Sequence, residues 1–567
     1  MPLDTSIYDN FPSYPFRRPP EMAGAVGRHP VAIVGAGPVG LTLAIGLARH
    51  GVGSVVIEPR RSVSFGSRAI CISRRSLEIW DRFGIAKAPL AKGLAWTGGR
   101  SFWRDNRLVL EFAMPHDADE KHPPMINLAQ CSMEQFLIDA ASALPEIDLR
   151  WQSAVREIDS RADGLRLRVA TPDGDYDLMA DYAVACDGAR SPVRAALGLE
   201  LHGTSYEGRY LIADIRLASE YPTERRAWFD PPSNPGSTVL MHRQPDDIWR
   251  IDYQLRDGED PEAEQHEERV RARIDAHLAM IGERAPYELV WISLYKAHAL
   301  TLDRYRHGRV LFAGDAAHLL PIFGVRGLNS GLDDAANLAW KLAAGVKGLG
   351  GEALLDSYSQ ERVFAAQENI RQARKSTLFM TPPGPGHALM REAALSLAVS
   401  QEFARPLVNP RQTTAITYQD TPLSTPDREA WSGGPAVGAT LPNAPVVLRR
   451  GNAVTSGYFL DIAGTNATLY LFLGAEGLDA SDDVALSRAA AAWPLDVVLI
   501  ADGGYQHPRF TVVSDTNGRA AARLAGAPGA AYLVRPDGHV AARWRRFAVG
   551  DLAPALARVY GRPLWGE

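Results

Sequence analysis

Three segments carry residues whose types and spacing could bind a nucleotide cofactor, and the first is GAGPVG at residues 35–40. It stands between a predicted strand and a predicted helix, and Glu58 ends the next predicted strand. In such a unit Gly35 permits the tight turn, Gly37 admits the pyrophosphate, and Gly40 lets the helix pack on the sheet. The Glu58 carboxylate is placed to bind the adenosine ribose hydroxyls. The segment predicts dinucleotide binding but does not separate FAD from NAD.

A second segment, residues 308–342, places an acid and a glycine-rich loop between a buried strand and a helix. It reads GRVLFAGDAAHLLPIFGVRGLNSGLDDAANLAWKL, with Asp315 after the predicted strand. The Asp315 carboxylate can accept hydrogen bonds from ribityl hydroxyls, and the helix start offers N–H groups and a positive dipole to negative charge. This arrangement suits a flavin ring and its ribityl-phosphate tail. The segment therefore indicates that the dinucleotide is FAD.

A third segment, ACDGARSPVR at residues 185–194, follows a predicted apolar strand. An Asp-Gly pair at the end of a strand, here at Asp187, is usually no more than a turn. Arg190, Ser191 and Arg194 then open a helix, which is unusual for a plain turn. Taken alone, the segment leaves a turn and a functional site equally open.

In this order and at these separations, the three segments resemble those of the class A flavoprotein aromatic hydroxylases, the single-component FAD monooxygenases. The resemblance covers about residues 30–380. The phrases VAIVGAGPVGL, VACDGAR, LFAGDAAHLLP and LNSGLDDAANLAWKLA are most similar to the hydroxyphenylpropionate and phenol hydroxylases. The fold class that this implies is α/β. A Rossmann-like FAD-binding domain is interleaved with a mixed β-sheet substrate domain, and a C-terminal thioredoxin-like α/β domain without CxxC follows.

The resemblance also implies roles for single cofactor residues. The motif at Asp187 would bridge FAD and the nicotinamide cofactor, and Asp315 would bind the flavin ribose. Arg68 takes the position of an arginine near the FAD pyrophosphate, and Gln130 that of a glutamine near the ribityl or phosphate groups. The plainer alternatives are a solvated arginine at position 68 and a helix-capping residue at position 130.

The reaction of the resembled family implies FAD as cofactor, NADPH or NADH as co-substrate, and a small phenol as substrate. Backbone N–H groups of Gly327, Leu328 and Asn329 would stabilise the anionic reduced flavin. O2 would add at the flavin C4a, and the resulting hydroperoxide would hydroxylate the activated ring. Pro321 and its neighbours would form the dry wall that protects this intermediate. The nicotinamide cofactor would visit only transiently, because a single dinucleotide fingerprint occurs in the chain.

The base that would remove the phenol proton is expected in the sheet that forms the substrate wall. We take His242 and Tyr253 as its candidates. Packing or a surface position is the commoner role for such strand residues, so both assignments compete with a purely structural one.

The loop before the last helix of the second segment departs from the family pattern. Gly-Gln-Gly is frequent there, whereas this chain has GVRG at residues 324–327. A fixed cation at Arg326 beside the flavin would favour an anionic or carboxylated substrate, or would steady an anionic reduced flavin. The alternative is that Arg326 points outward into solvent.

Two other functions fit the same motifs. One is a tailoring monooxygenase acting on a polycyclic natural product, and the volume of the substrate pocket would separate it from a hydroxylase of simple phenols. The other is a non-catalytic, FAD-containing interaction protein on an oxygenase scaffold, for which the intact motifs give little support.

The elements that must position these residues divide the chain into six predicted parts. Period-two alternation and turn signals predict strands over about residues 148–186 and 200–300, with a helical insert near 261–283. The parts are an N-terminal arm (1–28), the FAD-binding domain (29–200), a substrate sheet (201–300), the second FAD-binding part with helices (301–405), a linker (406–440) and the thioredoxin-like domain (441–567).

Composition excludes several classes of protein. A net charge of −5 without a basic stripe argues against nucleic-acid binding. No apolar run approaches the roughly 20 residues that span a bilayer, and the N-terminus lacks the apolar core of a signal peptide. The three cysteines form no metal or CxxC pattern, and the polar cluster at 116–122 is typical of a surface turn. We expect a cytoplasmic protein without a metal, a membrane or a nucleic-acid partner, with a homodimer as one option for its assembly.

Overall fold

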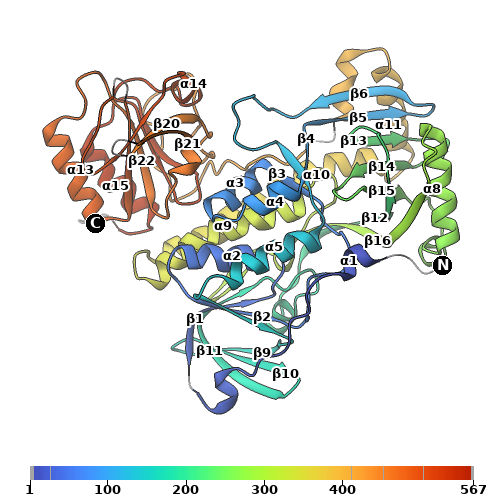
Figure 1. Cartoon of the computed structure of the whole chain (residues 1–567), viewed down its shortest axis with the longest axis horizontal. Helices are drawn as coiled ribbons and strands as arrows, with labels where there is room; N and C mark the ends of the chain where they lie inside the picture. Colours follow the sequence, from blue (N-terminus) through green and yellow to red (C-terminus); the bar gives the residue numbers. More distant parts are fainter. Residues whose placement is uncertain (1–4, 26, 410–411, 451–452, 502–503, 564–567) are drawn as a thin grey trace.

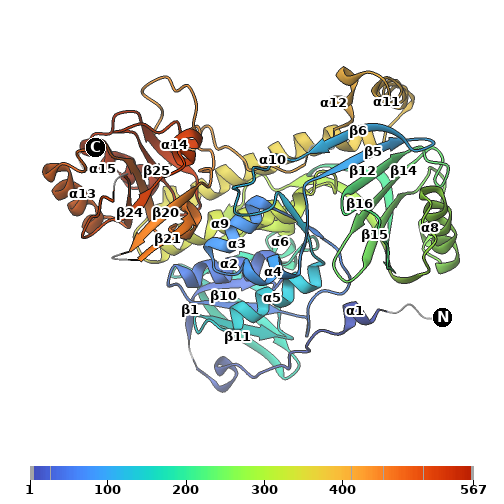
Figure 2. The same cartoon turned by 45° about the horizontal axis from the view of Figure 1, so that its top comes forward.

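The molecule is built around three large sheets, and each lies in its own part of the molecule (Figure 1). The computed structural model describes residues 5–25, 27–409, 412–450, 453–501 and 504–563. A largely parallel sheet and its helices form the centre, with a mixed sheet on one side and the C-terminal sheet on the other. The long helix α10 (Glu352–Met380) runs between these two outer parts (Figure 2). This architecture confirms the predicted α/β fold class.

The strands of the central sheet that lead into the glycine turn and into the two Asp-containing motifs run parallel. Its order is β17-β18-β11-β1-β2-β8, and β18, β11, β1, β2 and β8 run parallel. Every residue of β2 is buried, as a strand covered on both faces requires. The bounds are β1 (Arg28–Val34), β2 (Ser54–Glu58), β8 (Ile147–Trp151), β11 (Gly174–Ala185), β17 (Arg306–His307) and β18 (Val310–Phe312).

Strands β9 (Ala154–Ser160) and β10 (Leu165–Thr171) extend this sheet as an antiparallel meander with β11. The two turns of the meander coincide with the predicted turn signals, so the strands predicted for this region are confirmed.

Helices and a small sheet cover the parallel sheet. Helix α2 (Pro38–Arg49) packs against α5 (Gln130–Ser142) and α9 (Arg326–Val346) (Figure 1). Their apolar residues join both faces of the sheet in one buried core. The remaining elements are α3 (Arg74–Arg82), α4 (Lys87–Lys92), α6 (Pro192–Ala196) and the small sheet of β3 (Cys71–Ser73), β4 (Leu94–Trp96) and β7 (Met125–Asn127).

The mixed sheet has the order β19-β16-β12-β15-β14-β13-β5-β6, and only β13 and β5 pair in parallel among the described strands. The hairpin of β5 and β6 comes from inside the predicted FAD-binding part, so the predicted substrate sheet at 201–300 is too short. The bounds are β5 (Gly98–Trp103), β6 (Arg107–Ala113), β12 (His202–Leu217), β13 (Arg225–Phe229), β14 (Thr238–Arg243), β15 (Ile248–Gln254), β16 (Tyr287–Thr301) and β19 (His318–Leu319).

The two faces of the mixed sheet have different neighbours, because successive residues of a strand point to opposite faces. One face packs on α8 (Glu267–Ile281), which with α7 (Pro261–Glu264) confirms the predicted helical insert. The other face packs on α10, α11 (Pro385–Ala398) and α12 (Arg405–Val408). We call this second face the inner face.

The N-terminal arm lies along the body of the protein and begins with α1 (Ser6–Asp9) (Figure 2). The Tyr8 hydroxyl donates to the buried carboxylate of Asp214 at 2.7 Å. Farther along, the Tyr14 ring stacks on Trp151 with centroids 4.5 Å apart. The arm is therefore held by aromatic side chains at two points.

The C-terminal sheet has the order β21-β20-β24-β23-β22-β25-β26, with β22, β23 and β24 parallel at its centre. Its thioredoxin-like character stays a prediction, and the absence of cysteine after Cys186 rules out dithiol exchange there. The elements are β20 (Pro445–Arg450), β21 (Ala453–Tyr458), β22 (Ala467–Phe472), β23 (Leu495–Ile500), β24 (Thr511–Ser514), β25 (Ala531–Val534), β26 (Val540–Trp544), α13 (Ala480–Ala492), α14 (Arg519–Leu524) and α15 (Leu552–Val559).

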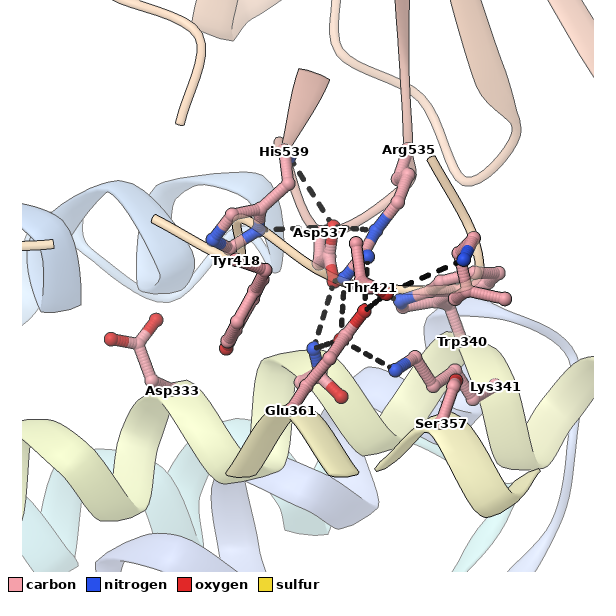
Figure 3. Close-up of polar contacts among 12 residues, drawn as sticks. Asp333, Trp340, Lys341, Ser357, Glu361, Tyr418, Thr421, Arg535, Asp537 and His539 are labelled. Carbon is pink, nitrogen blue, oxygen red and sulfur yellow. Dashed lines mark hydrogen bonds and ion pairs between the residues drawn. The ribbon is translucent and has the colours of Figure 1, made fainter. Parts of the chain in front are cut away.

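A buried ionic network joins this C-terminal domain to α9 and α10 (Figure 3). Arg535, in the turn between β25 and β26, donates to both oxygens of Glu361 on α10 at 2.6 and 3.0 Å. Lys341 of α9 donates to the same carboxylate at 2.7 Å. Thr421 of the predicted linker also donates to it. Glu361 thus binds three segments that are far apart in the sequence.

The acid of the network on the C-terminal domain is Asp537. It pairs with Arg535 and accepts from the Trp340 indole N–H at 3.1 Å. Burial opposes charge in such a network, but the two cations hold the pKa of Glu361 well below its usual value. Burial also lowers the pKa of Lys341 to about 8. The interface is therefore ionised and buried, and each charge depends on its partners.

Within the described ranges, none of the helices combines the length and the apolar character that crossing a membrane requires. The same ranges contain no group of three or more His, Cys, Asp or Glu side chains arranged to hold a metal ion.

Candidate functional site

The glycine turn after β1 has the close contacts that its sequence predicts. Gly35 has φ +107°, and a Cβ there would lie 2.5 Å from the carbonyl oxygen of Cys186. A Cβ at Gly40 would lie 2.1 Å from the carbonyl oxygen of Gly35. At Gly37, the N-cap of α2, a Cβ would meet nothing within 4 Å. The space before the N-terminus of α2 is therefore open to an approaching group, while the other two glycines close the turn.

Glu58 ends β2 as predicted, and its buried carboxylate faces the glycine turn. It accepts from the backbone N–H of Ala36 at 2.8 Å and from the backbone N–H of Arg60 at 2.9 Å. The Arg60 guanidinium binds the same carboxylate and also reaches Glu134 of α5 at 3.5 Å. Sequence reasoning missed both of these residues: Arg60, which binds the Glu58 carboxylate, and Glu134, which binds Arg60.

Gln130 and Arg68 meet in one loop. The Gln130 side-chain oxygen accepts from the backbone N–H of Ala69 at 3.3 Å, and its amide nitrogen donates to Glu134 at 2.9 Å. Gln130 is the first residue of α5 but makes no capping bond, so the helix-cap alternative is wrong. Arg68 has φ +41°, its side chain is exposed, and its carbonyl accepts from Arg250 of the mixed sheet. This loop thereby joins the two sheets.

Asp187 follows β11 at the same sheet edge as Gly35. One carboxylate oxygen accepts from the backbone N–H of Val193 at 3.1 Å, and the other is buried and without a partner in the described part of the chain. Burial raises the pKa of Asp187. Arg194 donates to the carbonyl of Ala316 at 3.1 Å. The third segment therefore contacts the second one directly.

Asp315 follows β18, the next parallel strand along. The carboxyl ends of β1, β11 and β18 meet at one edge of the sheet, so Gly35, Asp187 and Asp315 share that edge. The Asp315 side chain is accessible to solvent although both of its neighbours are buried. Loss of solvation among the surrounding protein atoms raises its pKa, while His318 and Arg68 act in the opposite direction. Arg68 and Asp315 thus lie close enough to interact electrostatically.

The loop that carries Asp315 is held by Asp334 of α9. Asp334 accepts from the backbone N–H of Gly314 at 2.9 Å and contacts His318 at 2.8 Å. Arg362 of α10 donates to its other oxygen. Burial works against its charge, but Arg362 and His318 keep the pKa of Asp334 below the usual value. Sequence reasoning missed Asp334, although an acid inside the apolar run LDDAANLAW was a signal.

Helix α9 begins at Arg326, so the helix start predicted after the Asp315 loop is confirmed. Gly327 and Leu328 are in the first turn, where backbone N–H groups lack intrahelical acceptors. A Cβ at Gly327 would meet nothing within 4 Å. The Asn329 side chain instead binds the backbone N–H of Ser73 at 2.9 Å and the carbonyl of Cys71 at 3.1 Å. Asn329 therefore fixes the helix start on the small sheet.

Arg326 does not point outward into solvent. Its side chain is 3% exposed and donates to Asn369 of α10 at 2.8 Å and to the carbonyl of Gln412 at 3.3 Å. Burial lowers its pKa to about 10. The solvent-facing alternative is therefore wrong, and the side chain ties the start of α9 to α10 and to the linker.

A narrow cavity lies between the inner face of the mixed sheet and α10. Strands β5, β13 and β14 form one wall, and α10 contributes Phe379 and Met380 to the other. Phe323, three residues before the start of α9, closes it toward the cofactor loop. Pro321 is buried in the same loop but does not line this cavity.

Strand register decides which polar residues share the inner face with the cavity. Ser101, Ala227 and Leu240 are neighbours across β5, β13 and β14 and line the cavity, and Asp252 of β15 continues their row. His242 lies on the same face and pairs with Arg250. Asp252 and His242 therefore point to the same face of the sheet as the residues that line the cavity.

The two predicted bases do not suit that role. Tyr253 lies on the opposite face, packed with His277 of α8 at 6.4 Å between ring centroids. It cannot reach the cavity. His242 is on the correct face, but burial, Arg225 and Arg250 lower its pKa well below the usual value. It therefore stays neutral and accepts a proton poorly.

Comparison with known proteins is consistent with this geometry. The family described as "FAD binding domain" matches residues 28–373, and the one described as "Aromatic-ring hydroxylase, C-terminal" matches residues 435–563. The 12-dehydrotetracycline 5-monooxygenase/anhydrotetracycline 6-monooxygenase of Streptomyces rimosus is 30% identical, over 90% of this chain and 95% of its own. The 3-(3-hydroxy-phenyl)propionate/3-hydroxycinnamic acid hydroxylase of Mycolicibacterium smegmatis is 32% identical, over 59% of this chain and 58% of its own.

Among solved structures, the flavin-dependent monooxygenase PieE in complex with FAD and substrate has a TM-score of 0.78 and 25% identity. That similarity covers 95% of this chain and 100% of the PieE chain. The likeness thus extends through the central sheet, the mixed sheet and the C-terminal domain.

We predict that Asp315→Ala weakens FAD binding about 10- to 100-fold, because a charged acceptor contributes roughly 1.5–3 kcal/mol. FAD fluorescence during titration of the apoprotein measures the dissociation constant. Asp303→Ala is the matched control, since Asp303 is highly exposed just before β17. Unchanged FAD affinity in Asp315→Ala would contradict the prediction.

Proposed function

The chain belongs to the family of FAD-dependent aromatic-ring hydroxylases, and from this premise we propose that it hydroxylates a phenolic ring bound between the mixed sheet and α10. The proposal depends on one observation: the cavity and the candidate cofactor site at the start of α9 share a wall. Phe323 lines the cavity and belongs to the loop that leads directly into the N-terminus of α9. An aromatic ring bound in the cavity would therefore lie next to a flavin bound at the N-terminus of α9.

The residues at the sheet edge fit FAD, and we assign them its parts. The open position at Gly37 suits the pyrophosphate, and the carboxylate of Glu58 suits the adenosine ribose. The accessible Asp315 suits the ribityl chain. Bound FAD, reduced by NADH or NADPH, supplies the electrons that activate O2 for insertion of one oxygen atom into the ring.

Arg68, Gln130 and Asp187 complete the proposed cofactor site. The buried, unpartnered oxygen of Asp187 offers an acceptor to the cofactor or to the visiting nicotinamide. Gln130 holds the loop of Arg68 in place, so that the Arg68 cation can approach the phosphates. The N–H groups of Gly327 and Leu328 at the start of α9 favour negative charge on the bound ring.

Asp252 is the residue best placed to accept the phenolic proton. It continues the row of Leu240 and Ala227, and one of its carboxylate oxygens is buried without a partner among the described residues. Burial, opposed by Arg250, raises its pKa to about 6. An acceptor with a pKa near the working pH is an effective base. Removal of the proton makes the ring electron-rich and ready for oxygenation.

A polycyclic phenol is the second candidate substrate. It is favoured by the length of the match, because the tetracycline enzyme aligns over 90% of this chain and the phenylpropionate enzyme over only 59%. The free space in the cavity, about 20 Å³, is smaller than either kind of ring, so the cavity volume does not choose between the two classes.

A panel of simple phenols and polycyclic phenols, offered with NADPH or NADH, tests the function. We expect members of one class to stimulate NAD(P)H oxidation and to yield products with one added oxygen by mass spectrometry. Stimulation without an oxygenated product, or no stimulation by any compound, would contradict a hydroxylase.

We predict that kcat/KM for the active phenol falls as the pH drops below about 6, because protonated Asp252 can no longer accept a proton. Asp252→Asn keeps the shape, and it should lower kcat/KM about 10²- to 10⁴-fold and remove this acidic limb. Stopped-flow or steady-state rates between pH 5 and 8 provide the measurement. Asp257→Asn, on an exposed turn after the same strand, should behave like the wild type. Wild-type rates in Asp252→Asn would exclude this base.

A further inference from the structure

Arg225 places a buried cation in the wall of the cavity. It begins β13, is 6% exposed and lines the cavity together with Ala227 and Phe229 of the same strand. These three alternate residues share the inner face, whereas Arg226 and Trp228 point away from it. The guanidinium is thus directed to the space proposed for the substrate.

The Arg225 side chain has no ion pair within the part of the chain that the structure describes. Its Nε and Nη1 atoms are shielded from solvent and lack any hydrogen-bond acceptor there. Neighbouring arginines differ. Arg250 binds Asp214 at 3.1 Å, Arg100 binds Glu224 at 3.1 Å, and Arg226 binds Glu224 through its guanidinium.

The charges nearest to Arg225 do not compensate it. Asp252 attracts it only from beyond ion-pair distance, and burial still lowers the pKa of Arg225. The Cys71 thiol is also near, but burial raises its pKa to about 12, so it is neutral at pH 7. A buried cation without a counter-ion is costly by several kcal/mol. A ligand that brings an anion into the cavity would remove this cost.

We propose that Arg225 binds a carboxylate of the substrate, so that the enzyme acts on phenols that carry an acidic side chain. This inference rests on the proposed function, because it assigns the substrate class of the same cavity. The planar guanidinium matches the two oxygens of a carboxylate and holds them in a fixed orientation. Asp252 remains for the phenolic hydroxyl, so the two inner-face groups recognise the two ends of one molecule.

The arginine that we expect to bind an anionic substrate is therefore Arg225, and not Arg326 as the sequence suggested. Arg326 is held by Asn369 and Gln412 outside the cavity wall, whereas Arg225 lines it. It also favours an aromatic acid over a neutral polycyclic ring as substrate.

The test compares 3-(3-hydroxyphenyl)propionate with its neutral amide, two probes of nearly equal size. Binding to the FAD-loaded enzyme is followed by the change in flavin absorbance, in the wild type and in Arg225→Gln, Arg225→Lys and Arg226→Gln. Thermal midpoints of the ligand-free proteins are measured in parallel. Neither measurement requires turnover, so a failure of the hydroxylase proposal is seen separately in the product assay.

We expect the wild type and Arg226→Gln to bind the carboxylate at least about 10-fold more tightly than the amide. Arg225→Gln should lose about 10- to 100-fold in affinity for the carboxylate and little for the amide. Arg225→Lys should recover part of this loss. Without ligand, Arg225→Gln should melt at the same or a higher temperature, because it removes an uncompensated buried charge.

Three results would overturn the proposal. The first is a wild type that binds neither probe or binds both equally. The second is an Arg225→Gln variant that keeps the preference for the carboxylate. The third is a lower melting temperature of Arg225→Gln together with equal weakening of both probes, which would make Arg225 a structural residue.

Discussion

Asp334 on α9 is fully buried and accepts hydrogen bonds from the cofactor loop on one side and from α10 on the other. Its partners are the N–H of Gly314, the ring of His318 and the guanidinium of Arg362. A carboxylate in such surroundings is stable only while all its donors are in place. The position of Asp315, which follows Gly314 directly, therefore depends on the packing of α9 against α10.

Glu361, the residue before Arg362 on α10, extends this dependence to the C-terminal domain. Glu361 binds Arg535 and Lys341, while Arg362 reaches Tyr418 of the linker at 2.7 Å as well as Asp334. The other end of the same helix lines the cavity through Phe379 and Met380. One helix thus connects the C-terminal domain, the cofactor loop and the substrate wall. We infer that the cysteine-free domain braces this helix.

The sequence allowed the cofactor edge to be predicted because that chemistry is local. Gly35 directly follows β1 and Asp315 comes shortly after β18, and parallel strands bring their carboxyl ends together without further information. The inner face was not predictable in the same way. Tyr253 and Asp252 are adjacent, and only the register of antiparallel strands decides which of them faces the cavity. Arg326 is buried by contacts with α10 and residue 412, and such long-range packing leaves no local signal.

Calorimetry of the FAD-loaded protein and its Glu361→Gln variant tests most directly whether the brace makes one cooperative unit. We expect a single transition with FAD release in the wild type. In Glu361→Gln, which leaves Arg535 and Lys341 without their shared carboxylate at a cost of about 3–5 kcal/mol, the C-terminal domain should unfold separately and FAD should be released at a lower temperature. Glu352→Gln, at the exposed start of the same helix, should match the wild type. A single, unshifted transition in Glu361→Gln would contradict the coupling of the C-terminal domain to the FAD site.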